Sequence, residues 1–143
     1  LIGVYGIANQ YAAIKTGATD DDLEKLKKAL WQGTTNLITR SKIGHIPQLL
    51  LEIVYQPDFQ GAIGSLDDKV SIKKAVYGSA FTKDEEFAIR GMKDVLVDIM
   101  PLVQAVKLYK DNIAKINIKL SDSINLIGNA ELKSELGDKV AEV

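Results

Sequence analysis

The sequence predicts an α+β fold, a ferredoxin-like βαββαβ sandwich with helices on one face of a mainly antiparallel sheet. Short apolar or alternating runs typical of strands recur along the chain, and two stretches with helical spacing separate them. The order of these elements makes two βαβ units joined by a hairpin-like region. The 143 residues are enough for one domain. We therefore expect a single domain, with a core at residues 1–120 and a C-terminal tail at 121–143.

The first third of the chain predicts a strand and a long helix. Residues 1–8, LIGVYGIA, are apolar and predict a buried strand, and residues 9–18 form a turn-rich connector. Thr19 lies three residues before Asp22, the spacing of a capping box. Leucines then recur at helical spacing, so we expect a helix over residues 20–39. Because the chain opens inside a strand-like run, we expect it to be a fragment of a longer protein.

The middle of the chain predicts two strands. Residues 48–55 are apolar on both faces apart from Glu52, which indicates a central strand covered on both sides. Residues 69–76 alternate between apolar and polar, which favours a strand with one exposed face; a short helix over 68–75 is the alternative. Residues 77–86 are polar and predict a loop.

The last third predicts a strand, a helix, a strand and a short terminal helix. Residues 94–99 alternate as a strand does, and Pro101 suits the first position of a helix that ends near 111–112. Residues 113–118 again alternate. In the tail, we expect Asn129 to cap a short helix that ends at Gly137.

Composition limits the functional classes. The net charge is −1, from 18 basic and 19 acidic residues, so the chain lacks the overall basic character usual in nucleic-acid binders, although a local cationic patch can still bind phosphate. No apolar run approaches the roughly 18 residues of a membrane span, and we expect no membrane partner. The absence of cysteine excludes disulfides and thiolate metal sites and fits a cytoplasmic location.

Residues 39–45, TRSKIGH, form a short basic connector between the predicted helix and the predicted central strand. Arg40 offers a two-pronged donor and Lys42 a point charge, and hydroxyls supply neutral donors, the mixture that suits phosphate. The alternative is that these cations only complement the negative end of the helix dipole. Five residues are therefore candidates for phosphate binding: Asn36, Thr39, Arg40, Ser41 and Lys42.

Catalytic and metal chemistry have little support. His45 is the only histidine, and a general base for RNA cleavage needs a partner that the sequence does not indicate. The acidic run at residues 20–22 is explained by helix capping, and no phosphate-binding loop, nucleophile elbow or zinc motif occurs. We expect no catalytic residue, no metal and no cofactor.

Residues 31–47 carry the pattern WxGTxNLxTRSKxGxxP, and an apolar strand ending in Tyr55 follows. The pattern resembles the backbone subunit of type I CRISPR Cascade complexes, particularly the type I-B branch. Further similarities lie around Gly6, Tyr11, Thr19, Ile63, Pro101 and residues 113–118.

The resemblance implies an RNA-recognition-like palm that polymerises along one CRISPR RNA. It would contact guide phosphates, meet target DNA through the guide, and assemble with copies of itself and with other Cascade subunits, which do the cutting. Arg40 and Lys42 would then contact phosphate, with Asn36, Thr39 and Ser41 as neutral donors and His45 as a further candidate, which makes six candidates for RNA binding. Two departures stand out: such subunits are about twice this length, and Gln48 occupies a position where a cation is expected.

Three functional hypotheses remain open at this point. The first is a non-catalytic, RNA-binding assembly subunit. The second is a metal-independent endoribonuclease of the same superfamily, with His45 acting on the 2′-hydroxyl. The third is a plain α+β scaffold whose connector only ends a helix.

Overall fold

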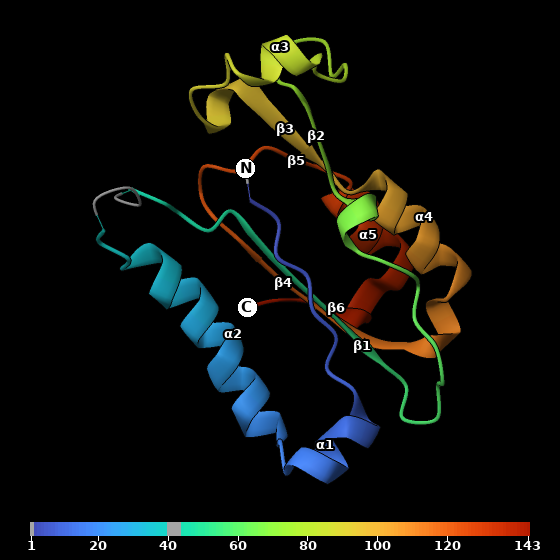
Figure 1. Ribbon diagram of the computed structural model, residues 1–143. Helices are drawn as coiled ribbons and strands as arrows, with labels where there is room; N and C mark the ends of the chain where they lie inside the picture. The colour runs from blue at the N-terminus through green and yellow to red at the C-terminus, as the bar shows by residue number, and fades with distance from the viewer. Residues whose placement is uncertain (1, 40–43) are drawn as a thin grey trace. The chain divides into compact units, whose positions relative to one another are not determined.

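A computed structural model describes residues 2–39 and 44–143 of the chain. The chain divides into two compact units, residues 1–47 and residues 48–143 (Figure 1). We call them the N-terminal unit and the C-terminal unit and describe each separately.

The N-terminal unit begins with a segment that is not a strand. Residues 2–8 have no regular secondary structure and are exposed, with Ile2 at 82% and Val4 at 83% exposure. The predicted buried strand at 1–8 is therefore wrong over its described part; Leu1 lies outside the described residues. A strand requires a hydrogen-bonding neighbour, and residues 2–8 are paired with no strand in the described part of the chain.

A short helix, α1 (Gln10–Thr16), replaces the predicted connector. The Asn9 side chain accepts hydrogen bonds from the backbone N–H groups of Tyr11 at 2.8 Å and Ala12 at 3.3 Å. Asparagine is among the strongest N-caps, because its side-chain oxygen satisfies amides that have no partner inside the helix. The turn-rich prediction for 9–18 is wrong because this cap starts a helix that ends before Gly17.

The long helix, α2 (Asp20–Thr35), starts where the sequence predicts and ends four residues early. Thr19 accepts a hydrogen bond from the Asp22 N–H, and the Asp22 carboxylate accepts one from the Thr19 N–H at 2.9 Å, which confirms the capping box. Hydrogen bonds from the Thr19 hydroxyl and N–H lower the pKa of Asp22. At the other end, the hydroxyls of Thr34 and Thr35 bond to carbonyls four residues back, a competition that weakens helices.

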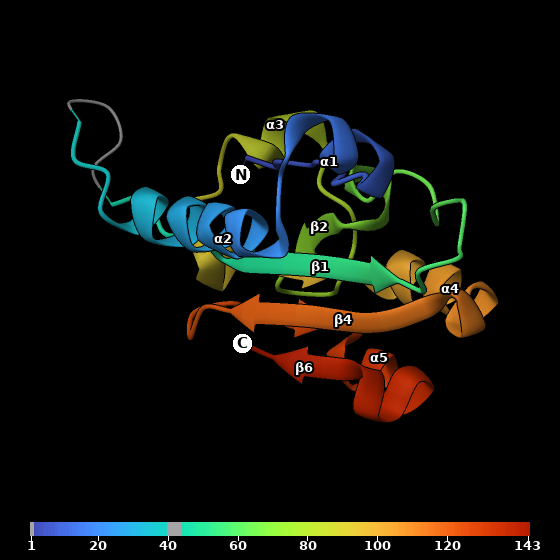
Figure 2. The same cartoon turned by 90° about the horizontal axis from the view of Figure 1, so that it is seen from below.

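The C-terminal unit contains two three-stranded sheets. In the first sheet β1 (Leu49–Tyr55), β4 (Ile113–Leu120) and β6 (Val140–Glu142) lie in the order β1-β4-β6 (Figure 2). Strand β4 pairs antiparallel with β1 and parallel with β6. Among the strands in the described residues, the central one of this sheet is therefore β4, and β1 lies at an edge, so the prediction of β1 as the central strand is wrong. Apolar residues on both faces of a strand do not by themselves fix its place in a sheet.

The second sheet has the order β2-β3-β5, from β2 (Ser71–Lys74), β3 (Val95–Asp98) and β5 (Leu126–Ile127). Both β2 and β3 confirm the predicted strands, in slightly shorter form, and the alternative helix over 68–75 is absent. Between them the predicted loop contains a single helical turn, α3 (Lys83–Glu86). Single 3-10 turns connect other elements, at Asp67–Lys69, Met92–Asp94, Lys110–Asn112 and Gly137–Lys139.

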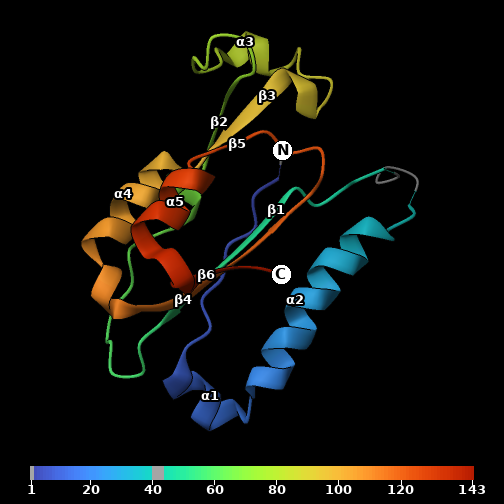
Figure 3. The ribbon, with the colours of Figure 1, turned by 180° about the vertical axis from the view of Figure 1, so that it is seen from behind.

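Two helices cover the core of the C-terminal unit. They are α4 (Met100–Leu108) and α5 (Asn129–Leu136), which lie side by side (Figure 3). Leu102, Val106 and Leu132 are completely buried and pack in one cluster with Ile113 and Ile116 of β4. Both helices were predicted, although Asn129 is the first helical residue of α5 rather than its cap. The fold is α+β and is consistent with a ferredoxin-like domain.

Candidate nucleic-acid interface

The basic connector starts where α2 ends. Asn36 occupies the C-cap position, and its backbone N–H donates to the Gln32 carbonyl at 2.9 Å. The Leu37 N–H donates to the Thr34 carbonyl at 3.3 Å, which closes the last turn. Both bonds use backbone groups only, and Asn36 is exposed to solvent. The role of its side chain in RNA binding stays a prediction.

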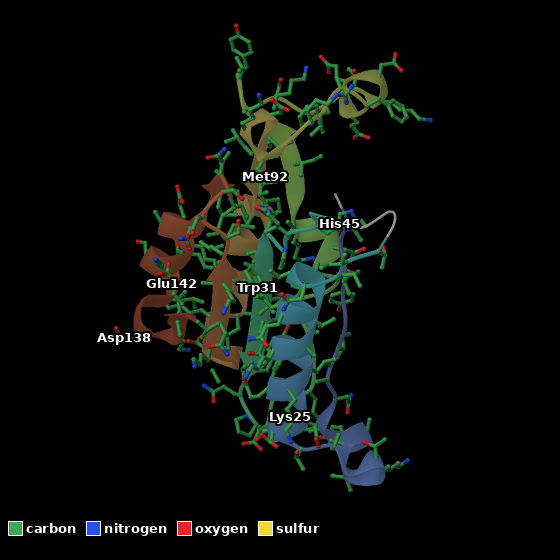
Figure 4. All side chains as sticks on the ribbon, turned by 90° about the vertical axis from the view of Figure 1, so that its left-hand side faces the viewer. Lys25, Trp31, His45, Met92, Asp138 and Glu142 are labelled. Carbon is green, nitrogen blue, oxygen red and sulfur yellow. The ribbon has the colours of Figure 1, made fainter. Side chains whose placement is uncertain are left out.

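Three of the six candidate residues lie in the described part of the chain. Asn36, Thr39 and His45 are all exposed, and Figure 4 labels His45 in the connector that follows α2. Arg40, Ser41 and Lys42 lie outside the described residues. Their role in phosphate binding therefore stays a prediction from the sequence.

The early end of α2 argues against the alternative in which the basic residues only complement the helix dipole. The last turn of α2 contains no basic residue, and Arg40 comes five residues after Thr35 along the chain. Stabilisation of a helix dipole by a cation falls off within the terminal turn. The alternative assumed a helix that runs to residue 39, which would have put Arg40 beside the helix end. The observed boundary removes that premise.

His45 has no catalytic companion in the described part of the chain, where no acid or base is hydrogen-bonded to it. A general base needs an orienting partner and a stabiliser of the developing charge. Among the same residues no group of three or more His, Asp or Glu side chains is placed to hold a metal ion.

Aromatic side chains can stack on RNA bases, and four of them differ in exposure: Tyr5, Tyr11, Trp31 and Tyr55. Tyr55 belongs to the core of the C-terminal unit: its hydroxyl accepts from the Ile63 N–H at 3.0 Å, and its ring centroid lies 5.2 Å from that of Phe59. Trp31 is half-buried on α2 (Figure 4). Tyr5 and Tyr11 are exposed. Tyr55 is thus the one of the four whose ring is committed to packing in the core.

Gln48, which stands where a cation was expected, has a structural role. Its side-chain carbonyl accepts from the hydroxyls of Ser121 at 2.9 Å and Ser123 at 3.0 Å, and its backbone carbonyl accepts from the Ser121 N–H. These bonds join the residue just before β1 to the segment just after β4. A residue held in this way fixes where β1 begins.

None of the helices seen in residues 2–39 and 44–143 has both the length and the apolar character that crossing a bilayer requires.

Comparison with known proteins yields a family match. The family described as CRISPR-associated protein Cas7 matches residues 1–100, a span that contains all six candidate residues. A curated relative, the CRISPR-associated protein Cas7 of Haloferax volcanii, is 25% identical over 136 residues. The match covers 94% of this chain and 35% of the relative, so the chain spans about a third of the relative's length.

Proposed function

The chain belongs to the CRISPR-associated protein Cas7 family, and from this premise we propose that it is a non-catalytic, RNA-binding backbone subunit of a type I Cascade antiviral complex. In this proposal several copies polymerise along one CRISPR RNA and assemble with other Cascade subunits in the cytoplasm. Target DNA is met only through base pairing with the guide. A protein in this role needs contacts to the RNA backbone and none that read the bases.

The observation that carries the proposal is that the family match includes the whole basic connector. The end of α2 at Thr35 supports it, because the basic residues are not used in the last helical turn. We assign Arg40 and Lys42 to phosphate, with Asn36, Thr39 and Ser41 as neutral donors and His45 as a further candidate. A small local cluster of this kind is compatible with a net charge of −1, since distant exposed charges are screened at physiological salt.

The test is a double substitution, Arg40→Ala with Lys42→Ala, in the full chain. We expect weaker binding to single-stranded RNA of every sequence, because phosphate contacts carry no base information. The slope of log affinity against log salt should become shallower by about 0.7 for each lost contact. Filter binding or fluorescence anisotropy at several salt concentrations measures both quantities.

A matched control removes two other lysines, Lys28→Ala with Lys110→Ala. Both side chains are exposed and neither makes an ion pair within the described residues. The control changes the net charge by the same amount and should leave RNA binding nearly intact. Equal losses in both double variants would show that only overall charge matters and would remove the assignment to the connector.

Cleavage of RNA distinguishes the endoribonuclease alternative from the non-catalytic function. We expect labelled repeat RNA to stay intact with the wild-type chain and with His45→Ala, because His45 has no acid or base partner in the described part of the molecule. Specific cuts that disappear in His45→Ala would refute the non-catalytic assignment.

A further inference from the structure

Three large apolar side chains project into solvent from the segment between β2 and β3, residues 75–94. Val76 is 62% exposed, Tyr77 95% and Phe87 74%. We call these three residues the apolar tip. Figure 1 shows α3 and the turn after β2 at the end of the β2–β3 ladder that points away from α4 and α5. The polar character of residues 77–86 predicted a loop and gave no indication of an apolar surface; the available signal was Tyr77-Gly78 directly after the predicted strand at 69–76.

The backbone holds Tyr77 in an unfavourable conformation. Its φ of +75° is the only positive value at a residue other than glycine among the described residues. A turn enforces it: the Lys74 N–H donates to the Ser79 carbonyl at 2.8 Å, and the Gly78 N–H donates to the Lys74 carbonyl at 3.2 Å. A left-handed conformation costs a tyrosine about 1–2 kcal/mol. Strain of this kind, at a fully exposed aromatic side chain, is typical of functional surfaces.

The part of the segment that carries Phe87 is also fixed by polar contacts. The Arg90 guanidinium donates to the Phe87 carbonyl at 2.7 Å. In α3, Thr82 and Glu85 form a capping box, and Glu85 also pairs with Lys74 at 2.6 Å. The apolar tip is therefore organised before it meets a partner, which reduces the entropy lost on binding.

The charges around the apolar tip favour a protein partner over a polyanion. Residues 75–94 contain four carboxylates and three cations, and Asp84 and Glu86 are exposed in the first turn of α3. A nucleic-acid phosphate would meet this acidic turn at a cost. An apolar protein surface with a cation at its rim would be complementary to it.

The N-terminal unit of the same chain offers such a surface. No described residue of that unit is buried, so its apolar side chains have no core of their own. On α1, Tyr11 is 54% and Ile14 81% exposed. Lys15 shares their face of the helix, since residues four apart are neighbours, and it makes no ion pair with any described residue. This face of α1 thus combines apolar groups with an available positive charge.

We propose that the apolar tip of one copy docks on the α1 face of a second copy, with Lys15 of the second copy facing Asp84 and Glu86 of the first. The proposal rests on the proposed function, since it supplies a contact for polymerisation. Because the two surfaces differ, the contact is head-to-tail and leaves a free surface at each end. An assembly built on it grows along a template instead of closing as a dimer.

The first test removes apolar contact. Tyr77→Asn deletes the aromatic ring, and asparagine tolerates the left-handed backbone, so the turn is expected to survive. Phe87→Ser is the second variant. In sedimentation velocity on the full chain, we expect both to raise the dissociation constant for self-association by about tenfold or more. The matched control is Leu108→Ser, because Leu108 is 81% exposed but lies at the end of α4; it should behave as wild type.

The second test reverses charge. Asp84→Lys with Glu86→Lys should weaken self-association, and adding Lys15→Glu should restore most of it. Recovery in the triple variant is specific to a contact between these groups. Three results would overturn the proposal: a wild-type chain that stays monomeric, unchanged association in both apolar variants, or no recovery in the triple variant.

RNA binding separates this proposal from the proposed function. On an RNA too short for two copies, the apolar-tip variants should bind as wild type does, whereas Arg40→Ala with Lys42→Ala should not. On long RNA the apolar-tip variants should lose cooperativity. If the chain fails to bind RNA but its self-association responds as described, the docking contact stands and the RNA assignment falls.

Discussion

Gly128 is the glycine whose replacement by alanine should lower the free energy of unfolding most. It precedes α5 with a φ of +101°, and a Cβ there would lie 2.9 Å from Ile99 Cγ1 and 3.2 Å from the Met100 backbone nitrogen. Both the left-handed backbone and the close approach of Ile99, itself completely buried, demand glycine. We expect Gly128→Ala to lower the free energy of unfolding by about 2–4 kcal/mol, measured by urea denaturation.

Gly137, at the other end of the same helix, provides the control. Its φ is also positive, at +55°, but a Cβ there would meet no atom within 4 Å. Gly137→Ala should therefore cost only the backbone strain, about 1–3 kcal/mol, because φ +55° with ψ −125° is a conformation that residues with a Cβ rarely adopt. If the two variants were equally stable, the packing against Ile99 would not matter.

At the scale of elements, α4 depends on a carboxylate from the preceding strand. Its N-cap residue, Ile99, offers no capping side chain. Asp98 Oδ1 instead accepts from the Met100 N–H at 2.8 Å, and Oδ2 pairs with Lys73 of β2 at 2.6 Å. Burial of Asp98 opposes ionisation, but the Lys73 ammonium and the Met100 N–H outweigh it, so the pKa of Asp98 lies below its usual value. One carboxylate thus ties β2, β3 and α4 together.

The dependence on Asp98 can be graded by substitution. Asp98→Ala removes both contacts and leaves Lys73 without its partner, and should destabilise the protein by about 3 kcal/mol. Asp98→Asn keeps an acceptor for the Met100 N–H, so its loss should be smaller. Thermal denaturation of the two variants gives the order; equal losses would mean that the helix cap contributes nothing.

Helices and strands that are specified by residues close together in the sequence were predicted correctly. Elements that depend on pairing with distant segments were missed or predicted wrongly. The capping box at Thr19 lies within four residues and fixed the start of α2 correctly. Alternation likewise found β3 and β4. The wrong prediction at 1–8 arose because strand formation depends on a neighbour that hydrophobicity does not reveal. The two-residue β5 and the three-residue β6 were missed because they are defined mainly by pairing with β3 and β4.

At the scale of the whole molecule, ionic contacts predict a loss of stability in acid. The pKa values of Asp67, Glu85, Glu135 and Glu142 are lowered by hydrogen bonds or cations, and that of Glu85 falls to about 2, chiefly because Lys74 donates to it. A carboxylate with a depressed folded-state pKa stabilises the fold above its unfolded value, and the contribution is lost as the pH falls through the folded-state value.

The melting temperature should therefore be nearly constant from neutral pH to about pH 5 and then decline down to about pH 2. Glu85→Gln should flatten the part of the decline that lies between pH 4.5 and pH 2. Because Glu85 is 45% exposed, added salt should reduce its share. A melting temperature independent of pH below 5 would contradict the assignment of these contacts. Calorimetry from neutral pH to about pH 2 measures the melting temperature.

The sequence predicted the residues of the candidate site but not, by itself, their function. Its residue types, Arg40 and Lys42 flanked by hydroxyls, come directly from the sequence, and the structure adds that Asn36, Thr39 and His45 are exposed. The function attached to them came from the family pattern, because two cations beside a helix end have more than one explanation. Only the observed end of α2 at Thr35 weakened the helix-dipole explanation.

The lack of any buried side chain among residues 2–39 has a consequence for how the protein associates. The 16-residue helix α2 has side chains that are at most half-buried, such as Trp31, and a helix of this length with so little tertiary support is marginally stable in water. The N-terminal unit should consequently gain most of its order at the moment it contacts another surface, so that folding and complex formation become a single coupled event. Such coupling lowers affinity for a given contact area. In the assembly that we propose, each copy would then be held weakly enough to be exchanged, while the array would stay together through many repeated contacts.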